Sequence, residues 1–405
     1  MISLRKALLV IWFAACLYPL SADGIGVNYL FALFPIGSLL LTGRLKNPGS
    51  LLLLIMGIFV FVFFCASFYQ LDLVSESGRR LISFLIFMAI FALTFVTLDA
   101  QTIAAFKLGA IVISVYFSLE SILVLLAAGP ANVGYAAKDL VGSQRFGFIY
   151  LFAFWLAYMD PDMKRSLGRL RLVILLALLG GLLLTFSRAS IVAILLSFAL
   201  FGLSRTGHWF RHLSLRGALS AVATLGGAGV LVLLLYQVFP QAFDFFGEHL
   251  FGFLSDSDSV EAHLLDQNSS EGTRVLLIQD ILDFISRNPV TGAGFLGVWV
   301  LPNSPTGSAH NQYLDVLFRT GVLGLIAYAT LLGFVLRHLA RSQRAMYWGL
   351  VGVLIYGLFH ETFKESQGAC LLAFLVGTYA QGLRDSAARA RESSHSVDSL
   401  YETSA

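Results

Sequence analysis

Residues 307–328 have the sequence "GSAHNQYLDVLFRTGVLGLIAY", which begins with polar side chains and ends as an apolar run. Polar and charged side chains stand at its start, among them His310, Asn311, Asp315 and Arg319. The apolar run predicts a membrane helix, because a helix rises about 1.5 Å per residue and the hydrocarbon core is about 30 Å thick. The polar side chains are therefore expected where the membrane meets water.

The composition of the whole chain is that of an integral membrane protein. Hydrophobic residues make up 57% of its 405 residues and charged residues 13%, whereas a soluble domain has about 25% charged residues. We predict an all-α protein with about 12 membrane spans. They are placed at residues 7–21, 27–43, 50–70, 81–98, 103–127, 145–160, 170–187, 189–204, 216–239, 317–336, 345–360 and 368–383. The first block resembles a signal peptide, and we expect it to be retained as a helix.

Lysine and arginine residues near the span ends predict the orientation of the chain, because cytoplasmic loops are enriched in them. With the N-terminus in the cytoplasm, 18 of the 27 such residues fall on the cytoplasmic side. Both termini are then cytoplasmic. The predicted regions are spans one to nine (1–239), an outer loop or cap (240–316), spans ten to twelve (317–383) and a disordered cytoplasmic tail (384–405).

Within the outer loop, residues 274–286 predict an amphipathic helix. Its apolar stripe consists of Leu277, Ile278, Ile281, Leu282 and Ile285. Turn-forming residues would end the helix, namely Asn288, Pro289, Gly292, Gly294 and Gly297. We expect this loop to form a small cap on the membrane bundle.

Three residues are the strongest candidates for chemistry. A histidine such as His310 can accept a proton from a hydroxyl near neutral pH; the alternative is an interfacial histidine that caps a helix. Arg188 lies between apolar stretches in "LLLTFSRASIVAILL", where a cation faces the bundle interior unless it reaches lipid phosphates. Arg274 opens the loop helix, and a guanidinium binds phosphate oxygens in a fork; the alternative is an ordinary loop arginine.

Other candidates on the outer side would bind substrate or line the same cavity. These are Asn311, Asp315, Arg319, Arg79, Arg80 and Glu120, with His360, Glu361 and Lys364 at the end of span eleven. Asp315 and Arg319 are one helical turn apart and are expected to pair. Arg79 and Arg80 would alternatively hold lipid headgroups. Small residues let membrane helices approach closely, and we assign that role to Gly321 and Gly324.

No metal site, cofactor site or nucleic-acid surface is predicted. The net charge is only +3, and the three cysteines are widely separated in apolar blocks. The acidic stretch "DSDS" at 256–259 is expected to be a flexible loop. Phosphate-binding loops, dinucleotide fingerprints and HExxH motifs are absent from the sequence.

Four features resemble the O-antigen ligase and polymerase superfamily of bacterial envelope glycosyltransferases. Three are sequence elements: "SAHNQYLDVLFRTGVLGL", "TFSRAS" and "GTRVLLIQDILDFISRNPVTGAGFLG". The fourth is the arrangement of spans around one large late loop. The resemblance covers roughly residues 165–335 by sequence and the remainder by topology alone.

The resemblance implies a GT-C-like fold in the bacterial inner membrane and a donor glycan on undecaprenyl diphosphate at the periplasmic face. It implies catalysis without a metal, with Arg188, Arg274 and His310 as functional residues. The two arginines would stabilise charge on the departing diphosphate. His310 would accept the proton of the attacking hydroxyl, with inversion at the anomeric carbon.

Three functions remain open from the sequence. The first is an O-antigen ligase, which transfers the glycan to the lipid A-core oligosaccharide. The second is a polymerase that joins lipid-linked repeat units of O-antigen or exopolysaccharide. The third is a polysaccharide transporter or flippase, which is disfavoured because neither an inverted repeat nor a matched pair of broken helices is evident. Membrane lipids are expected partners in each case.

Overall fold

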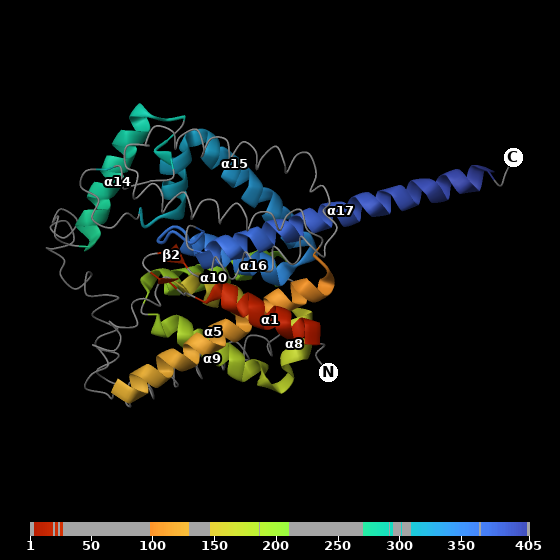
Figure 1. The fold of residues 1–405 in the computed structure, drawn as a ribbon, viewed down its shortest axis with the longest axis horizontal. Helices are drawn as coiled ribbons and strands as arrows, with labels where there is room; N and C mark the ends of the chain where they lie inside the picture. Colours follow the sequence, from red (N-terminus) through yellow and green to blue (C-terminus); the bar gives the residue numbers. More distant parts are fainter. Residues whose placement is uncertain are drawn as a thin grey trace. The chain divides into compact units, whose positions relative to one another are not determined.

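The computed structural model describes residues 4–18, 21–22, 25–26, 98–128, 146–185, 187–209, 270–290, 292–294, 301, 309–363 and 366–402. Over these residues the chain is helical except for a short antiparallel pair, β1 (Ser21–Ala22) and β2 (Ile25–Gly26). The helices are α1 (Leu4–Leu17), α5 (Ala100–Ala128), α7 (Gly147–Met159), α8 (Pro161–Leu167), the 3-10 helix η5 (Gly168–Leu170), α9 (Arg171–Leu184), α10 (Arg188–Trp209), α14 (Ser270–Arg287), α15 (Gln312–Ser342), α16 (Arg344–Tyr356) and α17 (Ser366–Glu402) (Figure 1). The predicted all-α class is confirmed for this part of the chain.

Three helical stretches in the described ranges are long and apolar enough to cross a membrane. They are Ala100–Ala127, Pro161–Leu184 and Gln312–Ser342. Four predicted spans, at 27–43, 50–70, 81–98 and 216–239, lie outside the described residues apart from Leu98. The total of about 12 spans, the periplasmic loop as a whole and the GT-C-like fold therefore stay predictions.

The chain divides into two compact units, and the first consists of Met1–Ile113, Leu276–Tyr347 and Gly357–Ala405. Three phenylalanines from α1, α5 and α17 form an aromatic core in this unit. The Phe106 and Phe374 rings stack with centroids 3.7 Å apart, and Phe13 meets them edge-on at 5.2 and 5.6 Å. Such aromatic contacts add to the burial of apolar surface, and they fix α1 against α17.

The second unit consists of Ser114–Val275 and Trp348–Tyr356. Helix α7 is buried around almost its whole circumference, as expected for a helix that is hydrophobic on all sides. Trp155 of α7 is fully buried, and its indole N–H donates to the Ser197 hydroxyl on α10 at 3.2 Å. The break predicted near residue 188 is present, since α9 ends at Leu184 and α10 begins at Arg188.

The C-terminal segment differs from the prediction of a disordered tail after residue 383. Helix α17 continues without interruption to Glu402 (Figure 1). Neither glycine nor proline occurs between residues 383 and 402, so nothing in the local sequence stops the helix. A side-chain bond from Gln381 to Asp385, at 2.7 Å, supports the turn where the prediction ended the span.

Candidate functional site

His310 has an unusual backbone conformation. Its φ is +49°, and it is the one non-glycine residue with positive φ among the described residues. This left-handed region costs an L-residue about 1–2 kcal/mol relative to the right-handed one. Such a conformation persists only where neighbouring contacts fix it, so the bonds around His310 decide how its imidazole is presented.

Asn311, the residue after His310, forms side-chain hydrogen bonds with two parts of the first unit. Its side-chain oxygen accepts from the backbone N–H groups of Tyr313 at 2.9 Å and Leu314 at 3.0 Å, which makes Asn311 the N-cap of α15. Its amide nitrogen donates to the Leu358 carbonyl at 2.9 Å. Helix capping is therefore performed by Asn311, and not by His310 as in the alternative considered from the sequence.

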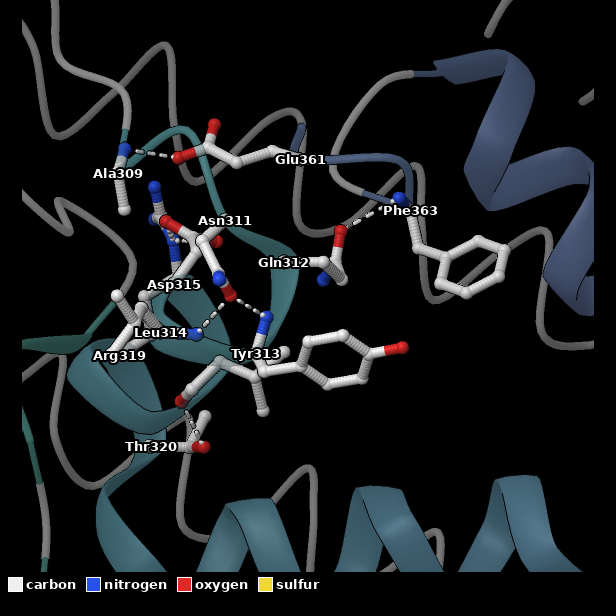
Figure 2. Close-up of polar contacts among 11 residues, drawn as sticks. Ala309, Asn311, Gln312, Tyr313, Leu314, Asp315, Arg319, Thr320, Glu361 and Phe363 are labelled. Atoms are coloured by element: carbon white, nitrogen blue, oxygen red, sulfur yellow. Dashed lines mark hydrogen bonds and ion pairs between the residues drawn. The ribbon is translucent and has the colours of Figure 1, made fainter. Parts of the chain in front are cut away.

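The turn of residues 357–363, between α16 and α17, forms further bonds to Ala309 and Gln312, as Figure 2 shows, and these residues stand before and after His310 in the sequence. On one side, the Ala309 backbone N–H donates to the Glu361 carboxylate. On the other, the Gln312 N–H donates to the Gly357 carbonyl at 2.8 Å. The Gln312 side-chain oxygen accepts from the Phe363 N–H, also at 2.8 Å. The residues on both sides of His310 are thus hydrogen-bonded to one turn, which lies about 50 residues further along the chain.

Asp315 and Arg319 form the pair expected from their spacing. The Arg319 Nε donates to both carboxylate oxygens of Asp315 at 2.8 Å. The two side chains are 4% and 9% exposed, respectively. Pairing lowers the cost of burying each charge. Asp315 follows His310 by about one and a half helical turns and Arg319 by about two and a half, and both lie on the part of α15 that Asn311 caps.

A kink at Gly321 separates that short segment from the rest of α15 (Figure 1). Gly321 has φ +63° and ψ −169°, which a residue with a Cβ rarely adopts. The uninterrupted membrane-length helix therefore begins at Val322, and the ion pair lies before it. The sequence suggested close packing of membrane helices at Gly321; the structure shows a helix break instead.

The turn after α14 docks on this kink. The Ala293 N–H donates to the Phe318 carbonyl at 2.6 Å, and the Val322 N–H donates to the Pro289 carbonyl at 2.8 Å. A Cβ on Gly321 would clash with the Val290 carbonyl. Pro289 and Ala293 of that turn and Gly321 of α15 thus belong to one backbone contact.

Apolar side chains attach α14 to the start of α15. A buried cluster contains Leu277, Ile281, Ala293, Ala309 and Phe318. Phe284 packs against it, with its ring centroid 4.9 Å from that of Phe318. The predicted stripe was partly wrong, because Ile278 and Leu282 are exposed and Phe284 takes their place. The predicted Ile285 is partly buried against the cluster, as Phe284 is, so the packed face consists of Leu277, Ile281, Phe284 and Ile285.

Arg274 lies on α14, and its side chain is outside the described part of the structure. Arg79 and Arg80 lie outside the described residues altogether. The roles of these three arginines therefore remain predictions. The backbone of Arg274 belongs to α14. The later part of this helix packs, through Leu277 and Ile281, against Ala309 and Phe318, which stand on either side of His310 in the sequence.

Arg188 is the first residue of α10 and belongs to the second unit. Buried hydroxyl groups organise the turn before it. The Thr185 hydroxyl donates to the Leu182 carbonyl at 2.7 Å and shares a hydrogen bond with the Ser190 hydroxyl at 3.2 Å. The Ser187 carbonyl accepts from the Ser190 N–H at 3.0 Å. The "TFSRAS" element therefore builds a tight corner with a half-buried arginine at a helix N-terminus, where anionic groups are favoured.

Of the remaining candidates, His360 lies on the 357–363 turn, and Lys364 lies outside the described residues. Glu120 lies on α5 in the second unit, with its side chain exposed. Among the described residues, no group of three or more His, Cys, Asp or Glu side chains is arranged to hold a metal ion.

Sequence reasoning missed Gln312 and the use of the 357–363 turn. Glu361 was a candidate for lining a cavity, but its bond to Ala309 was not foreseen. The available signal was an acidic residue in "GLFHETFK", a short polar interruption between two apolar blocks. That signal gives no partner, because the bonds join segments about 50 residues apart.

Comparison with known families gives one finding. Residues 173–329 match a domain family described as O-antigen ligase. The matched range contains Arg188, Arg274 and His310, and it ends within α15. The 357–363 turn lies beyond it. A comparison with curated proteins finds no match.

Proposed function

We propose that the protein is an O-antigen ligase, because residues 173–329 match a domain family described as O-antigen ligase. In this proposal it transfers a glycan from undecaprenyl diphosphate to the lipid A-core oligosaccharide. The reaction takes place at the periplasmic face of the bacterial inner membrane. Members of the family are glycosyltransferase-like enzymes, and the apolar helices agree with a membrane protein.

The observation that carries the proposal is the left-handed backbone of His310, whose neighbours on both sides are hydrogen-bonded to the 357–363 turn. The side chain follows a fixed turn, at the start of a helix that becomes membrane-length only after Gly321. A histidine can serve as a general base when it lies within hydrogen-bond reach of the proton it abstracts. A backbone held on both sides restricts where its imidazole can lie, which favours a defined attack geometry.

The chemistry follows from the donor. The acceptor oxygen forms a bond to the anomeric carbon while the bond from that carbon to the diphosphate oxygen breaks. The acceptor proton goes to His310, and the electron pair of the broken bond leaves with the diphosphate. Arg188 and Arg274 stabilise the charge that develops on the diphosphate. The anomeric configuration inverts because attack and departure occur on opposite faces.

The other polar groups support this arrangement in the proposal. Asn311 holds the turn, and the Asp315–Arg319 pair offers polar atoms close to it for an acceptor hydroxyl. Arg79, Arg80 and Glu120 are proposed as additional substrate contacts from their predicted place on the outer side. The reaction as proposed uses neither a metal nor a cofactor.

A polymerase is the second candidate, because the same domain family supports ligase-type and polymerase-type function alike. The two differ in the acceptor: a ligase uses core lipid, whereas a polymerase uses a second lipid-linked repeat.

The experiment offers both acceptors to the purified protein, together with a defined undecaprenyl-diphosphate donor, with and without a chelator. A product on core lipid alone supports the ligase. A lengthened lipid-linked glycan would instead establish the polymerase. Loss of transfer on adding the chelator would contradict the metal-independent mechanism.

A further inference from the structure

We infer that Glu361 is a positioning residue for His310, which it holds in its left-handed conformation through the backbone N–H of Ala309. This inference rests on the proposed role of His310 as the base. Glu361 lies outside the matched domain, on the turn between α16 and α17. The base would then be aligned by a segment that follows the family domain in the chain.

The first argument is burial. Glu361 is 8% exposed and Ala309 is 4% exposed. A buried carboxylate is costly unless hydrogen bonds satisfy it. One of its oxygens accepts from the Ala309 N–H, as Figure 2 shows. This bond joins the Ala309 N–H directly to the 357–363 turn, so it restrains the residue before His310.

The second argument is position. Ala309 directly precedes His310, whose φ of +49° is the conformation that requires support. Asn311 and Gln312 hold the other side through Leu358 and Gly357. With the Glu361 bond broken, the N-terminal side of His310 would lose this bond, whereas the bonds of Asn311 and Gln312 to the turn would remain. The backbone could then relax toward an ordinary φ, and the imidazole would move away from the attacking hydroxyl.

A different role for Glu361 would act through its charge, which would favour the protonated imidazole. Geometry and charge make opposite predictions for two substitutions. Glu361→Gln keeps the length and an acceptor oxygen but removes the charge. Glu361→Asp keeps the charge but shortens the side chain by one methylene, so that its oxygens no longer reach the Ala309 N–H.

The test measures glycan transfer by purified full-length variants over a range of donor concentrations and pH. For Glu361→Gln we expect kcat within about fivefold of the unsubstituted protein, because a neutral acceptor bond remains. For Glu361→Asp and Glu361→Ala we expect kcat to fall about 10- to 100-fold, with KM for the donor unchanged. The acidic limb of the pH profile should not move in Glu361→Gln. Asp385→Ala, an exposed carboxylate on α17, is the control and should retain full activity.

Thermal unfolding of each variant separates misfolding from misalignment, and the Gln–Asp comparison still stands if Glu361→Ala does not fold. Equal kcat for folded Glu361→Gln and Glu361→Asp would overturn the inference, as would a shifted acidic limb in Glu361→Gln. These results differ from failure of the proposed function itself. In that case the unsubstituted protein would show no transfer, or folded His310→Ala would transfer at the full rate.

Discussion

At the scale of single residues, the start of α15 shows how a short polar sequence fixes a local geometry. Asn311 provides the cap through its side-chain oxygen and a tether through its side-chain nitrogen. The two functions can be separated, because aspartate can accept the same bonds but cannot donate. This residue therefore tests whether the cap or the tether stabilises the turn.

We predict that Asn311→Ala lowers the stability of the protein by about 1 kcal/mol, the usual contribution of an N-cap. Asn311→Asp should lose less, because its carboxylate still accepts from Tyr313 and Leu314 and suits a helix N-terminus. Thermal unfolding in detergent measures both variants. Unfolding of Asn311→Ala at the temperature of the unsubstituted protein would show that the cap contributes nothing.

The Asp315–Arg319 pair gives a second prediction at this scale. Removing one partner leaves a buried charge without compensation, so Asp315→Ala should destabilise the protein by about 3–5 kcal/mol. The exposed pair of Arg5 and Asp99, at 3.0 Å, is the matched control. Its side chains are 59% and 44% exposed, and Arg5→Ala should cost at most about 1 kcal/mol.

Both variants are compared by thermal unfolding. A double variant, Asp315→Ala with Arg319→Leu, should recover part of the loss, since neither charge is then buried alone. An Asp315→Ala loss no greater than that of Arg5→Ala would mean that the pair is solvated in the protein.

At the scale of elements, the contact between the turn after α14 and the kink of α15 connects the loop helix to the His310 segment. It depends on backbone groups approaching closely, which only glycine permits at Gly321. We predict that Gly321→Ala lowers thermal stability by about 1–3 kcal/mol, through strain at a positive φ and loss of the docked turn. It should also expose α14 to proteolysis.

Gly333→Ala is the matched control on the same helix. A Cβ at Gly333 meets nothing within 4 Å, so alanine should be neutral or stabilising there, by up to about 1 kcal/mol. If both alanine variants unfold alike and α14 remains protected in each, the docking contact has no role in holding the cap.

Local features of these elements were predictable from the sequence, whereas tertiary ones were not. The helix over 274–286 follows from the periodicity of its apolar residues. The break near residue 188 follows from polar residues between two apolar stretches. The Asp315–Arg319 pair follows from the i, i+4 spacing. The kink at Gly321 was missed because glycine inside an apolar run has no local sign of a left-handed conformation. Its cause is the turn at residues 289–293, which only the folded chain brings close.

At the scale of the whole molecule, the central prediction is the orientation in the membrane. With both termini cytoplasmic, α14 lies outside and the end of α17 inside. We predict that a cysteine in place of exposed Asp283 on α14 is labelled by an impermeant thiol reagent in intact spheroplasts. A cysteine in place of Asp385 should be labelled only after permeabilisation. The reverse pattern would contradict the predicted topology. Cys16 and Cys370 are buried, which keeps their background labelling low.

The helical class of the described residues was predictable for a physical reason. Apolar blocks of membrane length lie in lipid, where water cannot hydrogen-bond to the backbone. A single segment there satisfies its backbone N–H and C=O groups by forming a helix. The His310 environment was not predictable, because it depends on bonds between the start of α15 and the 357–363 turn. The family match ends at residue 329 and therefore does not include that turn.

Glycan transfer by purified protein, with a defined undecaprenyl-diphosphate donor, tests most directly whether His310 and Arg188 carry the chemistry. Folded His310→Ala and Arg188→Ala should each lose at least about 100-fold in kcat, the scale of a lost general base or a lost charge-stabilising donor. Arg287→Ala, which removes an exposed cation from α14, should retain full transfer. Full transfer by both His310→Ala and Arg188→Ala would contradict the mechanism.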